Sequence, residues 1–199
     1  MLADLLDHYR HRPGIVVLGL PRGGVPVAAE VARSIGAPLD VFVVRKLGVP
    51  GREELAMGAI ASGGVRVLNE EVISRLEIPD EVVAAVTHRE EEELRRRELA
   101  YREGRPPLDV TGRPVILVDD GLATGSSMRA AIAAVRQKEP AEVVVAVPTA
   151  AESTVAALSA EADAVVSAIT PEPFAAVGHS YVDFSQTGDD EVRRLVAPP

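Results

Sequence analysis

The chain has 199 residues, of which 47% are hydrophobic, and a formal net charge of −9 at pH 7. This length and composition predict one globular domain over 1–199, and the negative charge argues against general nucleic-acid binding. The absence of cysteine excludes disulfides and thiolate chemistry, and the lack of a long apolar run or a signal-peptide pattern predicts a cytoplasmic protein without a membrane partner.

Apolar runs separated by helical patterns extend through most of the chain. They predict a helix over 2–9, a strand over 14–20, a helix over 25–35 that ends at Gly36, a strand over 39–44, and, after a break, strands over 115–118, 142–147 and 164–169 with helices over 127–138 and 151–160. Strands that alternate with helices predict an α/β fold, with a mainly parallel twisted sheet flanked by helices. Substrates of such sheets bind beyond the carboxyl ends of the strands.

Residues 45–113 break this alternation and are predicted to form an insertion of loop and helix. Five glycines between residues 45 and 64 favour a flexible loop. A short strand over 65–68 and a charged helix over about 79–102 follow. Along that helix acids precede bases, which is typical of a solvated face. Its basic triplet could suggest nucleic acid, but the neighbouring acids cancel the field.

The segment from Val115 to Ser127 carries the strongest functional pattern. A buried-strand pattern ends at two acids, Asp119 and Asp120, and a loop of small residues precedes the next helix. Free backbone N–H groups and a helix N-terminus suit a phosphate monoester, with Gly125 leaving room for the anion. The adjacent carboxylates can accept hydrogen bonds from two vicinal hydroxyls. The pattern therefore predicts a site for a ribose 5-phosphate.

Three other interpretations of this segment are weaker. An ordinary strand–loop–helix turn of a doubly wound fold would require all of these features to coincide by chance. A Walker A loop needs a lysine, and none lies between Lys46 and Lys138. A receiver domain carries an acidic pair, but its chemistry has no use for a loop such as Thr124–Ser127.

A second anion site is predicted after the first strand. The turn Pro21–Gly24 contains two glycines, which let a backbone approach an anion closely, and Arg22 adds a forked donor for phosphate oxygens. The competing interpretation is a simple tight turn. The presence of the acidic pair and small-residue loop in the same chain favours the functional one.

These segments resemble the signatures of type I phosphoribosyltransferases, which bind 5-phosphoribosyl-1-pyrophosphate (PRPP). Residues 115–127 resemble the PRPP signature, residues 19–24 the pyrophosphate loop, and Arg45-Lys46 the start of the flexible loop in adenine-type members. The resemblance implies a core over about 10–170, a loop and helical insertion over about 45–113, and a small C-terminal hood over about 171–199. It also implies transfer of ribose 5-phosphate from PRPP to a purine or pyrimidine base with release of pyrophosphate, as in purine salvage. Homodimers are frequent in the family.

The resemblance assigns roles to individual residues. The catalytic groups that it implies are Asp119, Asp120, Arg22 and Lys46. The substrate-binding residues that it implies are Leu20, Pro21, Arg22, Gly23, Gly24, Arg45, Lys46, Asp119, Asp120, Gly121, Leu122, Ala123, Thr124, Gly125, Ser126, Ser127 and Phe174. Mg²⁺ would arrive with PRPP, because magnesium binds mainly through substrate oxygens and the sequence has no cluster with metal-ligand spacing.

Two departures from the family pattern leave the acceptor open. Ala123 stands where 6-oxopurine members carry an acid that faces the base, as it does in adenine-type members, so a general base is missing there. Glu53 or Glu54 could replace it. The aromatic segment Phe174–Phe184 instead loosely resembles the hood of 6-oxopurine enzymes. Two other functions stay open: a PRPP-binding regulatory protein without transferase activity, and an enzyme that uses an acceptor other than a base.

Overall fold

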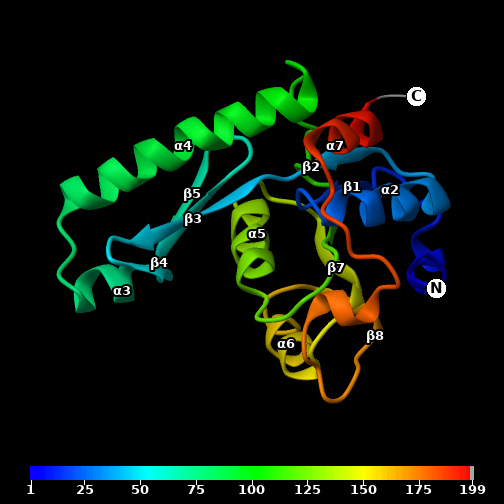
Figure 1. Cartoon of the computed structure of the whole chain (residues 1–199). Helices are drawn as coiled ribbons and strands as arrows, with labels where there is room; N and C mark the ends of the chain where they lie inside the picture. The colour runs from blue at the N-terminus through cyan, green and yellow to red at the C-terminus, as the bar shows by residue number, and fades with distance from the viewer. Residues whose placement is uncertain (198–199) are drawn as a thin grey trace.

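The computed structural model describes residues 1–197, and its centre is a five-stranded parallel sheet with the order β2-β1-β6-β7-β8. These strands are β1 (Val16–Gly19), β2 (Leu39–Val41), β6 (Pro114–Val118), β7 (Glu142–Thr149) and β8 (Ala164–Ile169). The helices that cover its faces are α1 (Leu2–Leu5), α2 (Gly24–Ile35), α5 (Ser126–Arg136) and α6 (Glu152–Leu158) (Figure 1). The predicted α/β class with a mainly parallel sheet is confirmed.

Covered faces explain why the strands read as continuous apolar runs. On one face of β6, Val115 and Leu117 belong to the same buried cluster as Met128 of α5. On the other face, Ile116 packs in a cluster with Val31 of α2. Successive side chains of a strand point to opposite faces, so a strand buried on both faces needs an apolar residue at every position.

The second predicted strand, 39–44, is shorter than expected, because the chain leaves the parallel sheet after Val41. It enters a second, antiparallel sheet with the order β3-β4-β5, formed by β3 (Val44–Val49), β4 (Arg52–Ala61) and β5 (Val65–Leu68). The flexible loop predicted for residues 45–64 is therefore corrected to two paired strands. The glycines serve this sheet: Gly51 takes a φ of +76° at the turn between β3 and β4, and a Cβ on Gly58 would lie 2.5 Å from the carbonyl oxygen of Val67 in the neighbouring β5.

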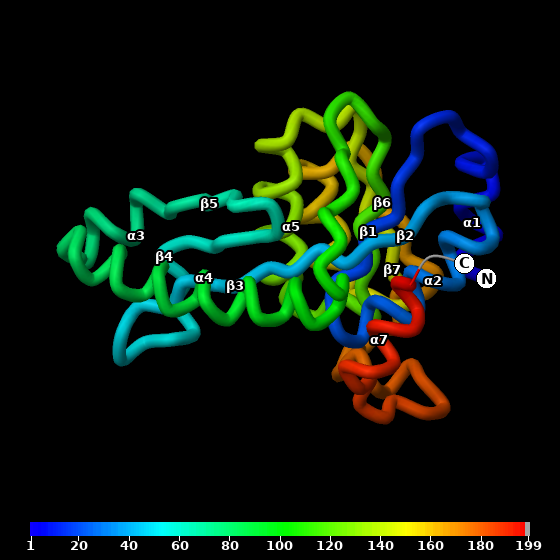
Figure 2. The backbone as a smooth tube through the Cα atoms, turned by 90° about the horizontal axis from the view of Figure 1, so that it is seen from above, coloured from blue at the N-terminus to red at the C-terminus, as the bar shows by residue number. Residues whose placement is uncertain are grey.

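The second sheet, together with α3 (Glu70–Arg75) and α4 (Asp80–Arg102), forms an arm over residues 44–102 that projects from the parallel sheet (Figures 1 and 2). The predicted charged helix is α4. Its last residue, Arg102, is buried, and its Nε donates to Asp40 Oδ1 at 2.9 Å while Nη2 donates to the Val41 carbonyl at 2.6 Å. This ion pair joins the arm to the strand from which the chain leaves the sheet.

The two ends of the chain differ from the predictions in detail. The predicted helix over 2–9 is divided into α1 and a short 3-10 helix, η1 (Asp7–Tyr9). After β8 an extended segment with the 3-10 helix η2 (Val177–Ser180) precedes α7 (Asp189–Val196), which packs against α2 and α4. The predicted hood over 171–199 thus has two parts, and residues 198–199 lie outside the described residues. Among residues 1–197 no helix combines the length and apolar character that a membrane span needs.

Candidate active site

Two loops that are far apart in sequence meet at the carboxyl edge of the parallel sheet. Strands β1 and β6 are neighbours, with Gly19 paired to Val118, and the Leu20 amide donates to the Val118 carbonyl at 2.8 Å. The turn that carries Arg22 and the acidic pair therefore lie side by side, as the carboxyl ends of neighbouring parallel strands must.

The two glycines of the first turn allow this close approach. A Cβ on Gly23 would overlap Asp120 Oδ2, and one on Gly24 would lie 2.7 Å from the Val118 carbonyl oxygen. The sequence suggests that these glycines make room for an anionic ligand. The structure shows that the missing side chains make room for Asp120 and the end of β6. The peptide bond between Pro21 and Arg22 is cis.

The acidic pair carries more negative charge than its surroundings neutralise. The Asp120 amide donates to Asp119 Oδ1 at 2.9 Å, but neither carboxylate takes part in an ion pair with another described residue. Burial, together with the repulsion of Asp120, raises the pKa of the Asp119 carboxyl to about 7. Burial also raises the pKa of Asp120. Such pKa shifts are typical of sites that bind a cation or a hydrogen-bond donor.

The raised pKa of Asp119 predicts a specific dependence of stability on pH. The reference pKa of 3.8 becomes about 7 in the folded protein, so the folded state binds the proton more tightly than the unfolded state. The associated stability is fully present below about pH 4 and is lost as the pH rises through about 7. Asp119→Asn should remove this loss, and denaturant unfolding between about pH 4 and 8 measures it. Parallel profiles for the two proteins would contradict the shift.

The small-residue loop after the acidic pair is held in place by hydrogen bonds with β7 and α6. The Leu122 amide donates to the Thr149 carbonyl at 3.0 Å, and the Thr154 hydroxyl donates to the Ala123 carbonyl at 2.5 Å. Gly125, with a φ of +70°, is the N-cap of α5. The amides of the first turn of α5 have no acceptor within the helix, and they lie at the positive end of the helix dipole. The loop therefore lies at the N-terminus of α5, where the sequence-based prediction places the phosphate.

One detail of this loop differs from the sequence-based expectation. A Cβ on Gly125 would lie 2.7 Å from Thr154 Cγ2 and 3.4 Å from Leu158 Cδ1. The space beside Gly125 is therefore filled by protein, not reserved for the anion. The glycine is needed because of its left-handed backbone and its contact with α6.

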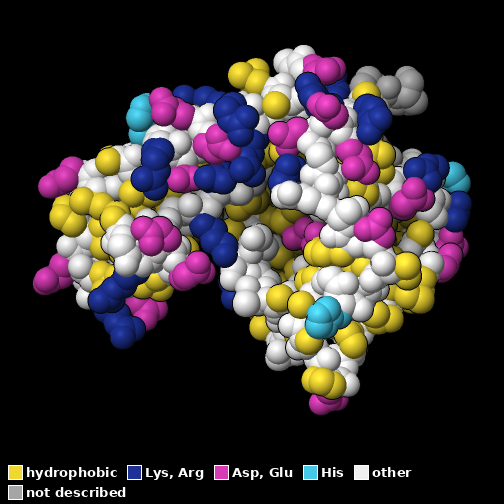
Figure 3. Space-filling model, in the orientation of Figure 1, with side chains coloured by type: hydrophobic (Ala, Val, Ile, Leu, Met, Phe, Trp, Pro, Cys, Tyr) yellow, Lys and Arg dark blue, Asp and Glu magenta, His cyan; other side chains and the backbone are white. Residues whose placement is uncertain are grey.

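The arm brings Lys46 towards the same loop. A cleft of about 420 Å³, here named the Lys46 cleft, is lined by both Lys46 of β3 and Ser127 of α5. Arg45 lines it too, but its Nε donates to Glu90 Oε2 at 2.9 Å, so part of its charge is already compensated. Glu53 also lines this cleft. In Figure 3 the surface is hollowed between the arm and the body of the molecule, with Lys and Arg side chains over α4 on the arm side.

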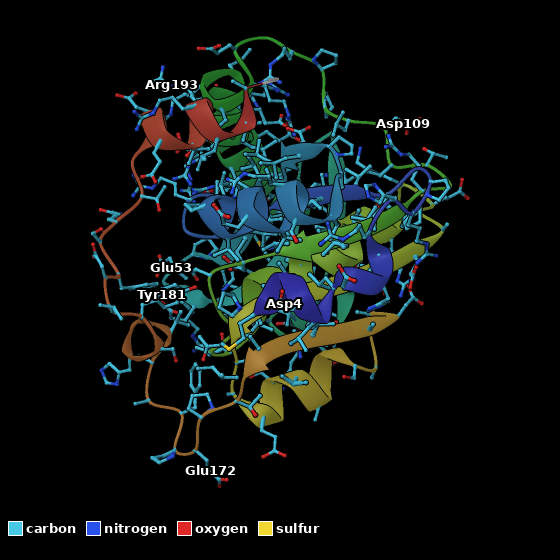
Figure 4. All side chains as sticks on the ribbon, turned by 90° about the vertical axis from the view of Figure 1, so that its right-hand side faces the viewer. Asp4, Glu53, Asp109, Glu172, Tyr181 and Arg193 are labelled. Carbon is cyan, nitrogen blue, oxygen red and sulfur yellow. The ribbon has the colours of Figure 1, made fainter. Side chains whose placement is uncertain are left out.

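A second cleft lies at the acidic pair and is lined by Asp120. This Tyr181 cleft, of about 560 Å³, is lined by residues that include Arg22, Arg97, Asp120, Tyr181 and Phe184. The Tyr181 hydroxyl donates to the Asp120 carbonyl at 2.6 Å, and the Tyr181 and Phe184 rings lie 5.0 Å apart. Figure 4 shows Tyr181 on the segment that returns from the loop at Glu172. The C-terminal segment thus contacts the acidic pair directly.

Fewer than half of the predicted residues line these two clefts, namely Pro21, Arg22, Gly23, Arg45, Lys46, Asp120 and Ser127. Phe174 is half-buried and lines neither cleft, whereas Tyr181 and Phe184, from the same aromatic segment, line the second one. Glu54 lines a further cleft beside Ser126. Sequence reasoning missed Arg97, whose only signal is a basic triplet typical of a solvated face.

Comparisons with known proteins identify the family of this chain. Residues 50–182, about two thirds of the chain, match the family model described as a phosphoribosyl transferase domain. The chain therefore belongs to the phosphoribosyltransferase domain family, as its sequence signatures indicated. The match begins after the Arg22 turn and ends before α7.

Individual relatives cover different shares of the chain. The Mycobacterium tuberculosis protein named "Putative phosphoribosyl transferase Rv0571c" is 51% identical over 178 residues, 89% of this chain, which spans 40% of that protein's length. The "Bifunctional protein PyrR" of Chloroflexus aurantiacus is 33% identical over 129 residues, 63% of this chain and 65% of that protein. The crystal structure of TT1426 from Thermus thermophilus superposes with a TM-score of 0.87 at 45% identity, over 98% of this chain and 92% of that one.

Proposed function

We propose that the protein transfers ribose 5-phosphate from PRPP to a nitrogenous base, a purine or a pyrimidine, and releases pyrophosphate. The observation that carries the proposal is the meeting of three groups at one edge of the sheet: the Arg22 turn, the acidic pair and the loop that begins α5. The loop that begins α5 offers hydrogen-bond donors to the 5-phosphate, and the acidic pair offers acceptors to the ribose hydroxyls. The Arg22 turn offers a positive charge to the pyrophosphate.

Each part of PRPP has a partner in this arrangement. The 5-phosphate accepts hydrogen bonds from the backbone at Thr124–Ser127, where the N-terminus of α5 favours an anion. The ribose hydroxyls donate to Asp119 and Asp120. Departure of pyrophosphate leaves positive charge on the ribose ring, as in related glycosyl transfers, and the two carboxylates stabilise it. Arg22 and Lys46 neutralise the leaving pyrophosphate from two sides.

The acceptor base is proposed to enter the Tyr181 cleft. Phe184 is 48% exposed, so its ring is free to stack on a planar base, and it is held beside the Tyr181 ring. Arg97, Asp120 and further polar groups line the same cleft and offer hydrogen bonds to the edge of the base. Because Glu53 and Glu54 line clefts on the phosphate side, neither faces an acceptor in this position.

Mg²⁺ fits this proposal as an ion that arrives with the substrate. Within residues 1–197 no group of three or more acids and histidines is arranged to hold a metal. The raised pKa values of Asp119 and Asp120 nevertheless mark a place where added positive charge is favourable. When bound, the ion would neutralise pyrophosphate oxygens, and the two carboxylates are the residues that would hold it there. The proposal further includes a homodimer in the cytoplasm.

The test is a pyrophosphate-release assay with PRPP, Mg²⁺ and a panel of purine and pyrimidine bases. We expect release with one base class, no release in EDTA, and strongly reduced release by Asp120→Asn. The alternative is a PRPP-binding regulatory protein without transferase activity, and Ala123 is compatible with both, because adenine-type members also lack an acid at this position. PRPP binding without release for any base would support that alternative, whereas absence of PRPP binding would reject both.

A further inference from the structure

Arg22 has a counter-ion that the family signatures do not include. Asp189 is the first residue of α7, and its Oδ1 lies 3.8 Å from Arg22 Nη1. The same oxygen accepts a hydrogen bond of 2.9 Å from the Tyr101 hydroxyl of α4. Asp189 lies beyond residue 182, where the family match ends. Within the described chain, Asp189 is the carboxylate with which Arg22 forms an ion pair.

The position of Asp189 is fixed by the packing of α7. Val192 and Val196 of this helix are buried in the same apolar cluster as Val25 of α2 and Tyr101 of α4. Helix α7 therefore packs against both α2 of the body and α4 of the arm (Figure 1). The packing of α7 and the hydrogen bond from Tyr101 therefore place the carboxylate near Arg22.

The contact between Asp189 and Arg22 is suited to exchange. At 3.8 Å it is an ion pair without a hydrogen bond, and the two side chains remain 47% and 35% exposed. Pairs of this kind contribute little to stability. A pyrophosphate group, with more charge and several oxygens, would bind the guanidinium more strongly through forked hydrogen bonds. While Asp189 stays close, however, its negative charge opposes the approach of the anion.

We infer that Asp189 is a resident counter-ion that holds Arg22 in the free protein and is displaced by the pyrophosphate group of the ligand. Arg22 then changes partner from the carboxylate to the phosphate oxygens, and Asp189 keeps its hydrogen bond to Tyr101. The inference rests on the proposed function for the identity of the anion. It assigns to α7, outside the family match, a direct influence on the affinity for pyrophosphate.

The test measures binding of pyrophosphate with Mg²⁺ by calorimetry. Asp189→Asn removes the opposing charge and keeps the size of the side chain, so affinity should rise by about three- to tenfold at low salt. Asp190→Asn is the matched control, since it removes the same charge one residue further along, where Asp190 pairs with Arg193. Affinity in this control should stay within about twofold. Asp189→Glu, which keeps the charge, should not tighten binding.

The effect must also depend on Arg22. In an Arg22→Gln background, the gain in affinity from Asp189→Asn should be clearly smaller than in the wild type, because only the direct repulsion between Asp189 and the anion remains to be removed. Unchanged or weaker binding by Asp189→Asn in the wild-type background would overturn the inference and would make Asp189 a structural residue. Wild-type protein that binds no pyrophosphate would overturn the proposed function as well. If Asp189→Asn does not fold, Asp189→Ser, which retains a hydrogen-bond acceptor at the start of α7, carries the same expectation.

Discussion

Replacement of Gly125 by valine should abolish PRPP binding. The residue adopts a φ of +70°, which a β-branched side chain tolerates at a cost of about 1–2 kcal/mol. Its Cβ would also lie 2.7 Å from Thr154 Cγ2, and relief of such an overlap costs a further amount of about 1–3 kcal/mol. Relief of this strain is expected to shift the loop and its amides away from the position that the phosphate requires. Calorimetry with Mg²⁺ and PRPP measures the loss, which should exceed about a hundredfold.

Gly112→Val provides a matched control for backbone strain. Gly112 also has a positive φ, +65°, but a Cβ there would meet nothing within 4 Å, and the residue lies before β6 at the opposite end of the strand. This variant should lose stability yet retain its affinity for PRPP. A folded Gly125→Val protein with normal affinity would show that the loop does not hold the phosphate.

Asparagine at position 119 or 120 should weaken PRPP binding by roughly ten- to a hundredfold. Each change replaces a charge-assisted hydrogen bond to a ribose hydroxyl by a neutral one, which is worth about 1.5–3 kcal/mol. Because burial already raises the pKa of both carboxyls, the substitutions should not destabilise the fold near neutral pH. Calorimetry and thermal unfolding of the same samples separate the two effects.

Asp109→Asn is the control for the acidic pair. This carboxylate is exposed and accepts hydrogen bonds from Thr111, on the loop before β6. The substitution removes one negative charge without touching the site, so PRPP affinity should stay near that of the wild type. Normal affinity in both Asp119→Asn and Asp120→Asn would exclude the acidic pair as the ribose-binding group.

The parallel sheet could be predicted from sequence because burial on both faces forces a recognisable pattern. Every position of β6 from Val115 to Val118 is apolar and buried. In the antiparallel sheet of the arm, β5 has the bounds of the strand predicted over 65–68, but β3 and β4 could not be predicted in the same way. Their glycines resemble those of a loop, although Gly58 is required by the contact with the Val67 carbonyl. The run over 39–44 also does not reveal where the chain changes sheets. Phe42 and Val43, which connect β2 to β3, are buried like Val41 at the end of β2.

The candidate site was predictable where it depends on neighbouring parallel strands. The Arg22 turn and the acidic pair follow β1 and β6, so their proximity follows from the topology. Which aromatic residue lies at the site could not be predicted, because this depends on how the segment after β8 turns back. That segment brings Tyr181, and not Phe174, to the acidic pair. The roles assigned to these residues stay predictions until ligand binding is measured.

The position of α7 has a consequence for where this molecule can be divided. A fragment that ends at residue 182, with the family match, would contain every residue of the PRPP signature and the Arg22 turn. It would nevertheless uncover Val25 and Tyr101, whose apolar cluster is completed by Val192 and Val196. The boundary of the recognisable family and the boundary of the cooperative folding unit are therefore different places in this chain.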